Sequence, residues 1–439
     1  MRLFLAILVG RLISYLTRTL KIGGGSAAPG LYALKIYPEL VTGLVQKIPK
    51  NVVITGTNGK TTTARMLAHF AKESGLKVIG NHTGSNLERG IVSTLITHTR
   101  EGLARLNYDL GIWELDEAAF NSVAPKLNPD IVVFLNVFRD QLDRYGEVDT
   151  LVKKWCQTLG EIDKETLVII NGDDTNTLRL KSCFKGIVET FGVENYKIIG
   201  ESLEFLKEQE NLDFEAKNVK LNGLKGTSFS LYINHLSSTI QLPIPGVYHI
   251  YDFLAAFASG ISLGFEPHDM TSSIRKFFPA FGRVEKLDFG YIFLIKNPAG
   301  ATQVFETIAP HLKKSDRLLI ALNDNLADGT DISWIWDAEF EKLVKRKKNQ
   351  KSAGVNTNPP QGWMIIASGT RAYDLANRLK YAGFDPKLTI VEEDLKKALQ
   401  LSKEGLKGQL FILPTYTAML ELQSILTKSG LKKHYWEEA

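Results

Sequence analysis

A glycine-rich turn between a β-branched run and a helical pattern constrains this chain more than any other feature. Residues 52–54 are Val-Val-Ile, residues 55–63 are Thr-Gly-Thr-Asn-Gly-Lys-Thr-Thr-Thr, and a helical pattern follows over 64–70. Glycines allow the backbone to curl so that successive N–H groups point at phosphate oxygens, and the N-terminus of the following helix adds partial positive charge. The stretch therefore predicts a phosphate-binding loop between a strand and a helix.

The polar residues of this loop have distinct expected roles. We expect Lys60 to reach the β- and γ-phosphates of a nucleotide, and Thr61 to hold Mg²⁺ through its hydroxyl group. The other residues expected to contact the nucleotide belong to the same turn and are Gly56, Thr57, Asn58, Gly59 and Thr62. A glycine-rich turn before an ordinary helix is the alternative, but such a turn does not require the Gly-Lys-Thr run.

Acidic residues follow a second apolar run. Residues 109–113 predict a strand, and Glu114, Asp116 and Glu117 come at its end. Carboxylates at a strand end near a phosphate loop are natural Mg²⁺ ligands, because Mg²⁺ prefers hard oxygen donors. We expect Glu114 to bind Mg²⁺, with Asp116 and Glu117 as the next candidates and a solvated acidic turn as the alternative.

The order of apolar runs indicates an α/β fold with more than one domain. Strand and helix patterns alternate from 51 to 263, which predicts a mostly parallel sheet with helices on both faces. Residues 187–240 differ, because the alternating segment 228–233 predicts antiparallel strands that form an excursion. A second alternation begins at Tyr291 and predicts a smaller α/β domain with strands over 318–321, 363–366 and 410–413. The expected divisions are 1–50, 51–285 and 286–439.

The N-terminal segment predicts an amphipathic helix. Residues 3–16 are largely apolar, but Arg2, Arg11 and Arg18 flank or interrupt them, and no small-residue cleavage site follows. The segment is too short and too charged to span a bilayer. We favour packing of this helix on the protein over a position on a membrane surface. A glycine-rich loop follows over 23–30.

Charge and cysteine content argue against several classes of protein and of binding site. A net charge of +5 in 439 residues does not argue for nucleic-acid binding, and the basic run 345–348 leads into a polar segment typical of a solvated loop. The two cysteines, Cys156 and Cys183, cannot build a disulfide framework or a four-thiolate zinc site. These counts favour a reducing, cytoplasmic compartment.

Several motifs, the loop among them, resemble the Mur ligase family in order and spacing. They are the loop 56–62, the Glu-x-Asp-Glu strand end 114–117, Asn136 with 140–146, the Asn-Gly-Asp-Asp run 171–174, Pro245-Gly246 before a helix, and Gly282-Arg283-x-Glu285. The resemblance implies a P-loop central domain with a parallel sheet and a Rossmann-like C-terminal domain. It also implies that ATP and Mg²⁺ are used to join an amine to a carboxylate through an acyl phosphate.

Within that family the chain is similar to the MurT branch, through the stretches 23–30, 138–147, 296–300, 325–337 and 415–420. This resemblance implies amidation of the D-glutamate α-carboxyl in the lipid II stem peptide to D-isoglutamine. The ammonia would come from a GatD-type glutaminase partner. Lys60, Arg283 and Lys296 would surround the transferring phosphoryl group, so Arg283 joins the nucleotide site and Lys296 the catalytic one.

The same resemblance implies that the C-terminal domain docks the glutaminase and lends an aspartate to its triad. We favour Asp337 for this role, with Asp331 and Asp328 as the next candidates. A turn or helix-cap role is the alternative for each of these aspartates. The substrate would be met at the inner face of the membrane.

The chain departs from the family pattern in three places. The region of the four-cysteine zinc ribbon, about 200–222, contains no cysteine, so we expect no zinc. Gln141 stands where most Mur ligases have a histidine, which weakens a second metal ligand. His249 and Asp252 occupy positions that usually carry adenine-reading asparagines, and we expect Asp252 to contribute to nucleotide binding.

Two other functions stay open. One is a free-standing Mur-type ligase that joins an amino acid, as folylpolyglutamate synthases do, and dependence on a glutaminase would distinguish it. The other is a non-catalytic scaffold that binds a glutaminase, which ATP turnover would exclude.

Overall fold

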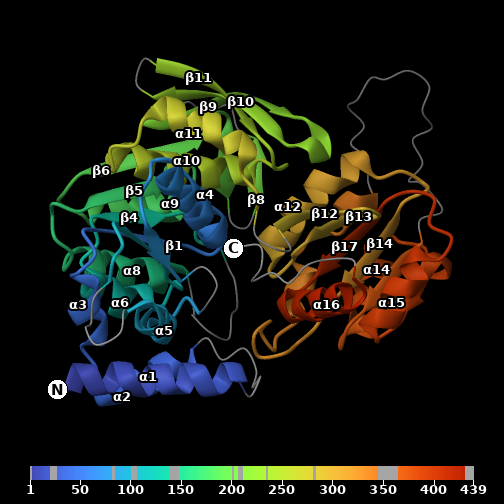
Figure 1. Cartoon of the computed structure of the whole chain (residues 1–439). Coiled ribbons are helices and arrows are strands. Elements are labelled where there is room, and N and C mark those ends of the chain that lie inside the picture. Colours follow the sequence, from blue (N-terminus) through green and yellow to red (C-terminus); the bar gives the residue numbers. More distant parts are fainter. Residues whose placement is uncertain are drawn as a thin grey trace.

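The structure is a computed structural model that describes residues 2–19, 27–81, 85–99, 106–138, 148–199, 202–205, 211–233, 236–279, 283–344 and 364–430. The strands described there form a nine-stranded sheet, a six-stranded sheet and a two-stranded hairpin. Figure 1 shows the two large sheets at the centres of two α/β domains that lie side by side. The predicted fold class is confirmed.

The larger sheet has the strand order β11-β10-β9-β6-β5-β4-β1-β3-β2. Its first six strands along the chain are β1 (Lys50–Thr55), β2 (Val78–Gly80), β3 (Leu110–Glu114), β4 (Ile131–Phe134), β5 (Leu167–Asn171) and β6 (Val188–Val193). All six pair in parallel. Their β-branched runs suit strands buried on both faces: Val52 and Ile54 pack into one helical layer, and Val53 packs into the other.

Helices cover both faces of this sheet, as predicted (Figure 1). One face packs against α4 (Lys60–Glu73), α10 (Tyr248–Ser262) and α11 (Pro267–Ser273). The other packs against α3 (Leu40–Val45), α5 (Glu88–His98), α6 (Phe120–Leu127) and α8 (Val148–Leu159). A short helix, α9 (Thr175–Leu178), and a 3₁₀ turn, η1 (Arg179–Ser182), follow β5. The carboxyl ends of the central parallel strands therefore form one edge, where α/β sheets bind ligands.

The predicted antiparallel excursion is present, but it begins later than expected. Its main strands are β9 (Phe214–Leu221), β10 (Thr227–Ile233) and β11 (Leu236–Leu242), which pair antiparallel and extend the larger sheet. Phe229 and Leu231 face the core, as the alternation of β10 predicts. The boundary at 187 is wrong, because β6 (Val188–Val193) is a parallel strand of the main sheet. The hairpin of β7 (Tyr196–Ile199) and β8 (Ser202–Phe205) follows it.

The second domain has the strand order β12-β13-β17-β14-β15-β16. Its strands are β12 (Arg283–Leu287), β13 (Gly290–Phe293), β14 (Arg317–Ala321), β15 (Ile365–Ser368), β16 (Thr389–Val391) and β17 (Leu410–Pro414). Its helices are α12 (Pro298–Ile308), α13 (Glu341–Val344), α14 (Ala372–Tyr381), α15 (Leu395–Lys403) and α16 (Tyr416–Lys428). Because β12 pairs antiparallel with β13, the sheet begins at Arg283, and the expected division after Glu285 falls inside a strand.

The N-terminal segment forms α1 (Arg2–Thr19) and α2 (Ala28–Ile36), and the predicted helix packs on the first domain. Ala6 and Ile7 join the same buried cluster as Ile91 and Val92 of α5. Among the described residues, no helix is long and apolar enough to cross a membrane. Residues 23–26 of the expected glycine-rich loop, and Gln141 with its neighbours, lie outside the described residues. The expected loop ends earlier than residue 30, because Ala28, Pro29 and Gly30 are the first residues of α2.

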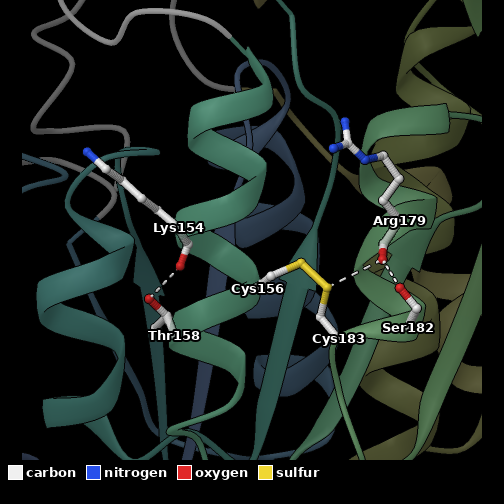
Figure 2. The surroundings of a disulfide bond; sticks show 6 residues. All are labelled: Lys154, Cys156, Thr158, Arg179, Ser182 and Cys183. Carbon is white, nitrogen blue, oxygen red and sulfur yellow. Dashed lines mark hydrogen bonds between the residues drawn. A yellow bond between two sulfur atoms is a disulfide. The ribbon is translucent and has the colours of Figure 1, made fainter.

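The two cysteines are bonded to each other (Figure 2). Cys156 belongs to α8 and Cys183 follows η1, and their Cα atoms lie 5.2 Å apart across 27 residues of sequence. That separation is ordinary for a disulfide. The cysteine count led us to expect a reducing compartment and did not predict this disulfide. Only the packing of α8 beside η1 brings the two residues together.

Candidate functional site

The phosphate-type loop lies at the carboxyl edge of the larger sheet, between β1 and α4. Gly56 and Gly59 have φ values of 130° and 92°. A Cβ atom on Gly59 would lie 2.2 Å from Oδ1 of Asp252, so both the left-handed backbone and the close approach require glycine there. The predicted strand–loop–helix unit is therefore present at the edge where parallel sheets bind ligands.

Residues at the end of β4 clamp this loop. Oδ1 of Asn136 accepts a hydrogen bond from the Asn58 amide at 2.8 Å, and Nδ2 of Asn136 donates to the Asn58 carbonyl at 3.1 Å. The Thr57 amide donates to the Asn136 carbonyl at 2.9 Å, and the Thr57 hydroxyl accepts from the Phe138 amide at 3.0 Å. The loop is thus held in shape by the neighbouring strand.

Lys60 is buried at the start of α4, where Thr62 is also buried. Its ammonium group donates to the carbonyls of Gly56 and Thr57, and it lies 3.4 Å from Oε2 of Glu117. Glu117 is 3% exposed, so this is a buried ion pair. Glu117 therefore serves as the counterion of Lys60, a role that the sequence pattern did not distinguish from metal binding.

The expected metal ligands Thr61 and Glu114 are adjacent. The Thr61 hydroxyl donates to Oε2 of Glu114 at 2.7 Å. The Glu114 backbone is fixed by Asn81, which accepts from its amide at 2.8 Å and donates to its carbonyl at 2.9 Å. Asp116 instead accepts from the Ala118 amide within its own turn. A hydroxyl and a carboxylate form a hard oxygen pair of the kind that suits Mg²⁺.

Asn81 is a site residue that sequence reasoning missed. It follows the short strand β2, and a single polar residue after three strand residues gave no motif to recognise. Within the described part of the chain, no group of three or more His, Cys, Asp or Glu side chains could hold a metal ion.

Asp252 lies beneath the loop in the first turns of α10. Its Oδ2 is 2.9 Å from Nδ1 of His249, and its Oδ1 is 3.5 Å from the Thr63 hydroxyl. The side chains of His249 and Asp252 are both buried. Nε2 of His249 is buried with no hydrogen-bond partner among the described residues. An orphaned buried nitrogen of this kind is compatible with a polar ligand group beside it, such as part of a nucleotide.

The second domain reaches this loop through Lys296 and Asn297. Nζ of Lys296 donates to the Thr57 carbonyl at 3.2 Å. Asn297 exchanges two side-chain hydrogen bonds with Asn58, and its Oδ1 also accepts from the Gly300 amide, which caps α12. Arg283 begins β12, and its side chain lies outside the described part. Two lysines from two domains, Lys60 and Lys296, thus meet at one loop.

Three aspartates named from the sequence have three different environments. Asp328 is buried and caps α16, because its carboxylate accepts from the amide and the hydroxyl of Thr417. Burial raises the pKa of Asp328, and these hydrogen bonds oppose the shift. Oδ1 of Asp331 accepts from the Ser333 amide at 2.8 Å, which lowers its pKa. Asp337 is exposed at the end of the 3₁₀ turn η5 (Ser333–Trp336).

The backbone that carries Asp337 is fixed by Arg378 of α14, a residue that sequence reasoning also missed. The buried guanidinium donates to the carbonyls of Ile335 and Ala338 at 2.9 and 2.8 Å. Its two terminal nitrogens also donate hydrogen bonds to the Glu341 carboxylate, at 2.9 and 3.0 Å. Asp337 therefore projects from a braced turn, which is what a residue that acts on another protein needs.

Comparisons with known proteins agree with this architecture. Residues 54–260 match the Mur ligase middle domain, and residues 294–419 match the MurT ligase C-terminal family. The chain is 30% identical to the Streptococcus pneumoniae lipid II isoglutaminyl synthase (glutamine-hydrolyzing) subunit MurT, over 92% of this chain and 93% of that protein. It is 29% identical to the protein of the same name from Staphylococcus aureus strain COL, with the same coverage.

A crystal structure of MurF from Acinetobacter baumannii has the same fold. The TM-score is 0.67 at 16% identity, and the match covers 92% of this chain and 81% of that chain.

Proposed function

The chain belongs to the MurT family of Mur ligases, and from this premise we propose that it is the ligase subunit of a lipid II isoglutaminyl synthase. In this role it uses ATP to amidate the D-glutamate α-carboxyl of the lipid II stem peptide, which becomes D-isoglutamine. Its work belongs to peptidoglycan synthesis. The proposal rests on the names of relatives at 29–30% identity along nearly the whole chain, and on the geometry of the phosphate-type loop.

The observation that best supports ligase chemistry is that Lys60 and Lys296 contact the same loop. Lys60 comes from the first domain and Lys296 from the second, and both donate to the Thr57 carbonyl at 3.2 Å. With a nucleotide present, two ammonium groups at this position suit phosphate oxygens. Such charges stabilise phosphoryl transfer because they face the negative charge that develops on the phosphate.

The chemistry explains why these parts are required. A carboxylate is a poor electrophile, since its negative charge repels nucleophiles and oxide does not leave. One carboxylate oxygen attacks the γ-phosphorus of ATP, ADP leaves, and an acyl phosphate forms. Ammonia then attacks the acyl carbon, phosphate leaves, and the nitrogen loses a proton. The amide and inorganic phosphate remain.

Mg²⁺ fits the hydroxyl–carboxylate pair of Thr61 and Glu114, which would hold it beside the phosphates, and Mur ligases in general depend on ATP and Mg²⁺. When bound, the ion neutralises phosphate charge. In the chain itself, Asn81 orients Glu114, Asn136 shapes the loop, and Glu117 holds Lys60 in place.

A glutaminase partner of the GatD type supplies the ammonia in this proposal. The relatives are named as subunits of a glutamine-hydrolysing enzyme, which supports a complex of two chains. Asp337 is the preferred aspartate for orienting the partner's catalytic histidine, because it is exposed on a braced turn while Asp328 is engaged in capping α16. The complex is expected in the cytoplasm, where its membrane-linked substrate presents its stem peptide at the inner face of the bilayer.

A free-standing amino-acid ligase is disfavoured. The match of residues 294–419 is to the MurT ligase C-terminal family, and the relatives named as MurT match along 92% of the chain.

The test is amidation of purified lipid II, followed by mass spectrometry and partial hydrolysis to locate the new amide. The protein is supplied with ATP, Mg²⁺ and ammonium chloride, first alone and then with a copurified glutaminase and glutamine. We expect a D-isoglutamine residue in both settings and none without ATP. Incorporation of an amino acid in place of ammonia would overturn the proposal.

A further inference from the structure

The N-terminal helix α1 has two apolar faces, of which only one is used by the fold. Ala6 and Ile7 are buried against the first domain, and Gly10 allows a close approach, since a Cβ there would lie 2.6 Å from Cδ1 of Ile96. Arg11 fastens the helix by donating to the carbonyl and hydroxyl of Thr99 at the end of α5. The position of α1 is therefore set by packing on one side alone.

The opposite face of α1 carries large apolar side chains that face solvent. They are Phe4, Leu5, Leu8, Leu12, Tyr15 and Leu16, with exposures from 44% to 67%. The neighbouring helix α2 adds Leu31 and Tyr32 at 41% and 49%. Eight of the eighteen exposed large hydrophobic side chains in the described part of the chain therefore lie on two adjoining helices. We call this set the α1–α2 face.

The arrangement is a continuous stripe and not scattered exposure. The spacing 4, 5, 8, 12, 15, 16 follows the helical repeat, so these side chains project to one side. A helix of 18 residues is about 27 Å long at 1.5 Å per residue. Figure 1 shows α1 along one side of the first domain, far from the β9–β11 end, with its length open to the outside. Contiguous apolar faces of this size mark interaction sites.

The charge around the face indicates what kind of partner fits. The first 38 residues contain five Lys or Arg and no Asp or Glu. Arg2 is exposed at the start of α1, and Lys35 lies over the Tyr32 ring at 5.4 Å. Arg11 donates to the carbonyls of Ile96 and Thr99 and to the Thr99 hydroxyl, and these neutral acceptors do not cancel its charge. An apolar stripe within a wholly basic segment complements an anionic bilayer, where apolar residues enter the interface and cations meet lipid headgroups.

We propose that the α1–α2 face docks the protein on the surface of an anionic lipid bilayer. The helix lies in the interface without crossing it, which agrees with the finding that no described helix is suited to span a membrane. The inference does not depend on the ligase activity, because it predicts binding to lipid that contains no substrate. From the sequence we favoured packing of this helix on the protein over a position on a membrane surface. In this proposal α1 does both, because its two faces point in opposite directions.

The test is flotation of the full chain with two kinds of vesicle, pure phosphatidylcholine and a mixture with phosphatidylglycerol. We expect binding to the anionic vesicles, weaker binding to the neutral ones, and a decrease as salt is raised. The variant Leu8→Gln/Leu12→Gln/Leu16→Gln should lose at least tenfold in vesicle affinity. The matched control is Ile187→Gln/Leu221→Gln/Leu236→Gln, which changes three even more exposed apolar residues elsewhere and should bind as the wild type does.

A second measurement covers the case in which the triple variant does not fold. Hydrogen exchange of the wild-type chain with and without anionic vesicles should show protection of peptides from α1 and α2, and unchanged exchange in α14 and α15. Three outcomes would overturn the proposal: no vesicle binding, equal loss in the control variant, or a wild-type dimer that α1 substitutions dissociate while vesicles have no effect. The last outcome would assign the α1–α2 face to a second copy of the chain.

Discussion

Asn58 and Asn297 exchange two side-chain hydrogen bonds although 239 residues separate them. Nδ2 of Asn58 donates to Oδ1 of Asn297 at 3.3 Å, and Nδ2 of Asn297 donates to Oδ1 of Asn58 at 3.0 Å. This reciprocal pair joins the phosphate-type loop of one domain to the first turn of α12 in the other. It places Lys296, the preceding residue, against the same loop.

Breaking this pair should impair turnover without unfolding either domain. Asn58→Ala removes both hydrogen bonds but leaves the α12 cap of Asn297 intact. Two hydrogen bonds of about 1 kcal/mol each give an expected loss of ten- to thirtyfold in kcat/KM for ATP. Steady-state kinetics of ammonia-driven amidation measure it, and Asn222→Ala is a matched surface control. An unchanged kcat/KM would mean that the interdomain pair is not formed during turnover.

Loss of Lys60 should abolish activity and also destabilise the fold, a consequence that the sequence alone did not suggest. Lys60→Ala removes a phosphate-binding charge, with an expected rate loss on the order of a thousandfold or more. It also leaves Glu117 buried without its counterion, which costs about 3 kcal/mol or more. The double variant Lys60→Ala/Glu117→Gln should recover stability but not amidation. Amidation at a near-normal rate in either variant would refute the assignment of the loop.

Substitutions of the three aspartates of the second domain should have different effects on amidation driven by glutamine and amidation driven by free ammonia. Asp337→Asn should lose glutamine-dependent amidation, by about ten-thousandfold if it acts as a triad aspartate does, and keep amidation driven by free ammonia. Asp331→Asn should leave both reactions intact. Asp328→Asn should lower the melting temperature, because one oxygen that accepts from Thr417 is replaced by a donor.

Two outcomes would change these assignments. Equal loss of ammonia-driven and glutamine-driven activity in Asp337→Asn would place Asp337 in the ligase site or the fold. Normal glutamine hydrolysis by the complex in all three variants would place the partner's aspartate elsewhere.

Asp174 should give the first domain a measurable pH dependence. Burial raises its pKa to about 6, although the amides of Val137, Asn176 and Thr177 oppose the shift. The folded state therefore binds the proton of the Asp174 carboxyl group more tightly than the unfolded state does. The stabilisation of the folded state by this proton is present at low pH and is lost as pH rises through about 6. Between pH 5 and pH 7 the free energy of unfolding should fall by roughly 1 kcal/mol from this group.

Urea unfolding of the wild type and Asp174→Asn at both pH values isolates that contribution, because other titrating groups cancel in the comparison. The variant should be less stable overall, since the Asp174 carboxylate accepts from the Val137 amide at 2.7 Å and the Asn176 amide at 2.8 Å. An identical pH dependence in the two proteins would show that Asp174 is ionised in the folded state throughout.

The disulfide should contribute to stability but not to catalysis. Closing a loop of 27 residues gives an expected stabilisation on the order of 3 kcal/mol from the unfolded chain. Cys156→Ser/Cys183→Ser, or reduction of the wild type, should lower the melting temperature by several degrees and leave kcat unchanged. Alkylation followed by mass spectrometry counts the thiols before and after reduction. Two alkylated thiols in protein purified under oxidising conditions would refute the bond.

The sequence by itself determined the class of fold and the position of the loop, because those depend on local patterns. The β-branched run, the glycines and the Gly-Lys-Thr stretch are adjacent in the chain, so residues 52–63 could be interpreted without distant contacts. The strand-end position of Glu114 and the alternation of 228–233 were equally local. Each of these predictions needed the periodicity of one element and nothing from the rest of the molecule.

The tertiary structure alone decided how carboxylates and cations are paired. Glu114 and Glu117 are three residues apart and chemically alike, yet one bonds Thr61 and the other Lys60, because the turn after β3 points them at different parts of α4. Asp328 and Asp337 share one motif, but Thr417 engages the first while Arg378 braces the turn of the second. Such roles depend on partners about 40 to 90 residues away, and short-range sequence patterns carry no record of which distant elements pack together.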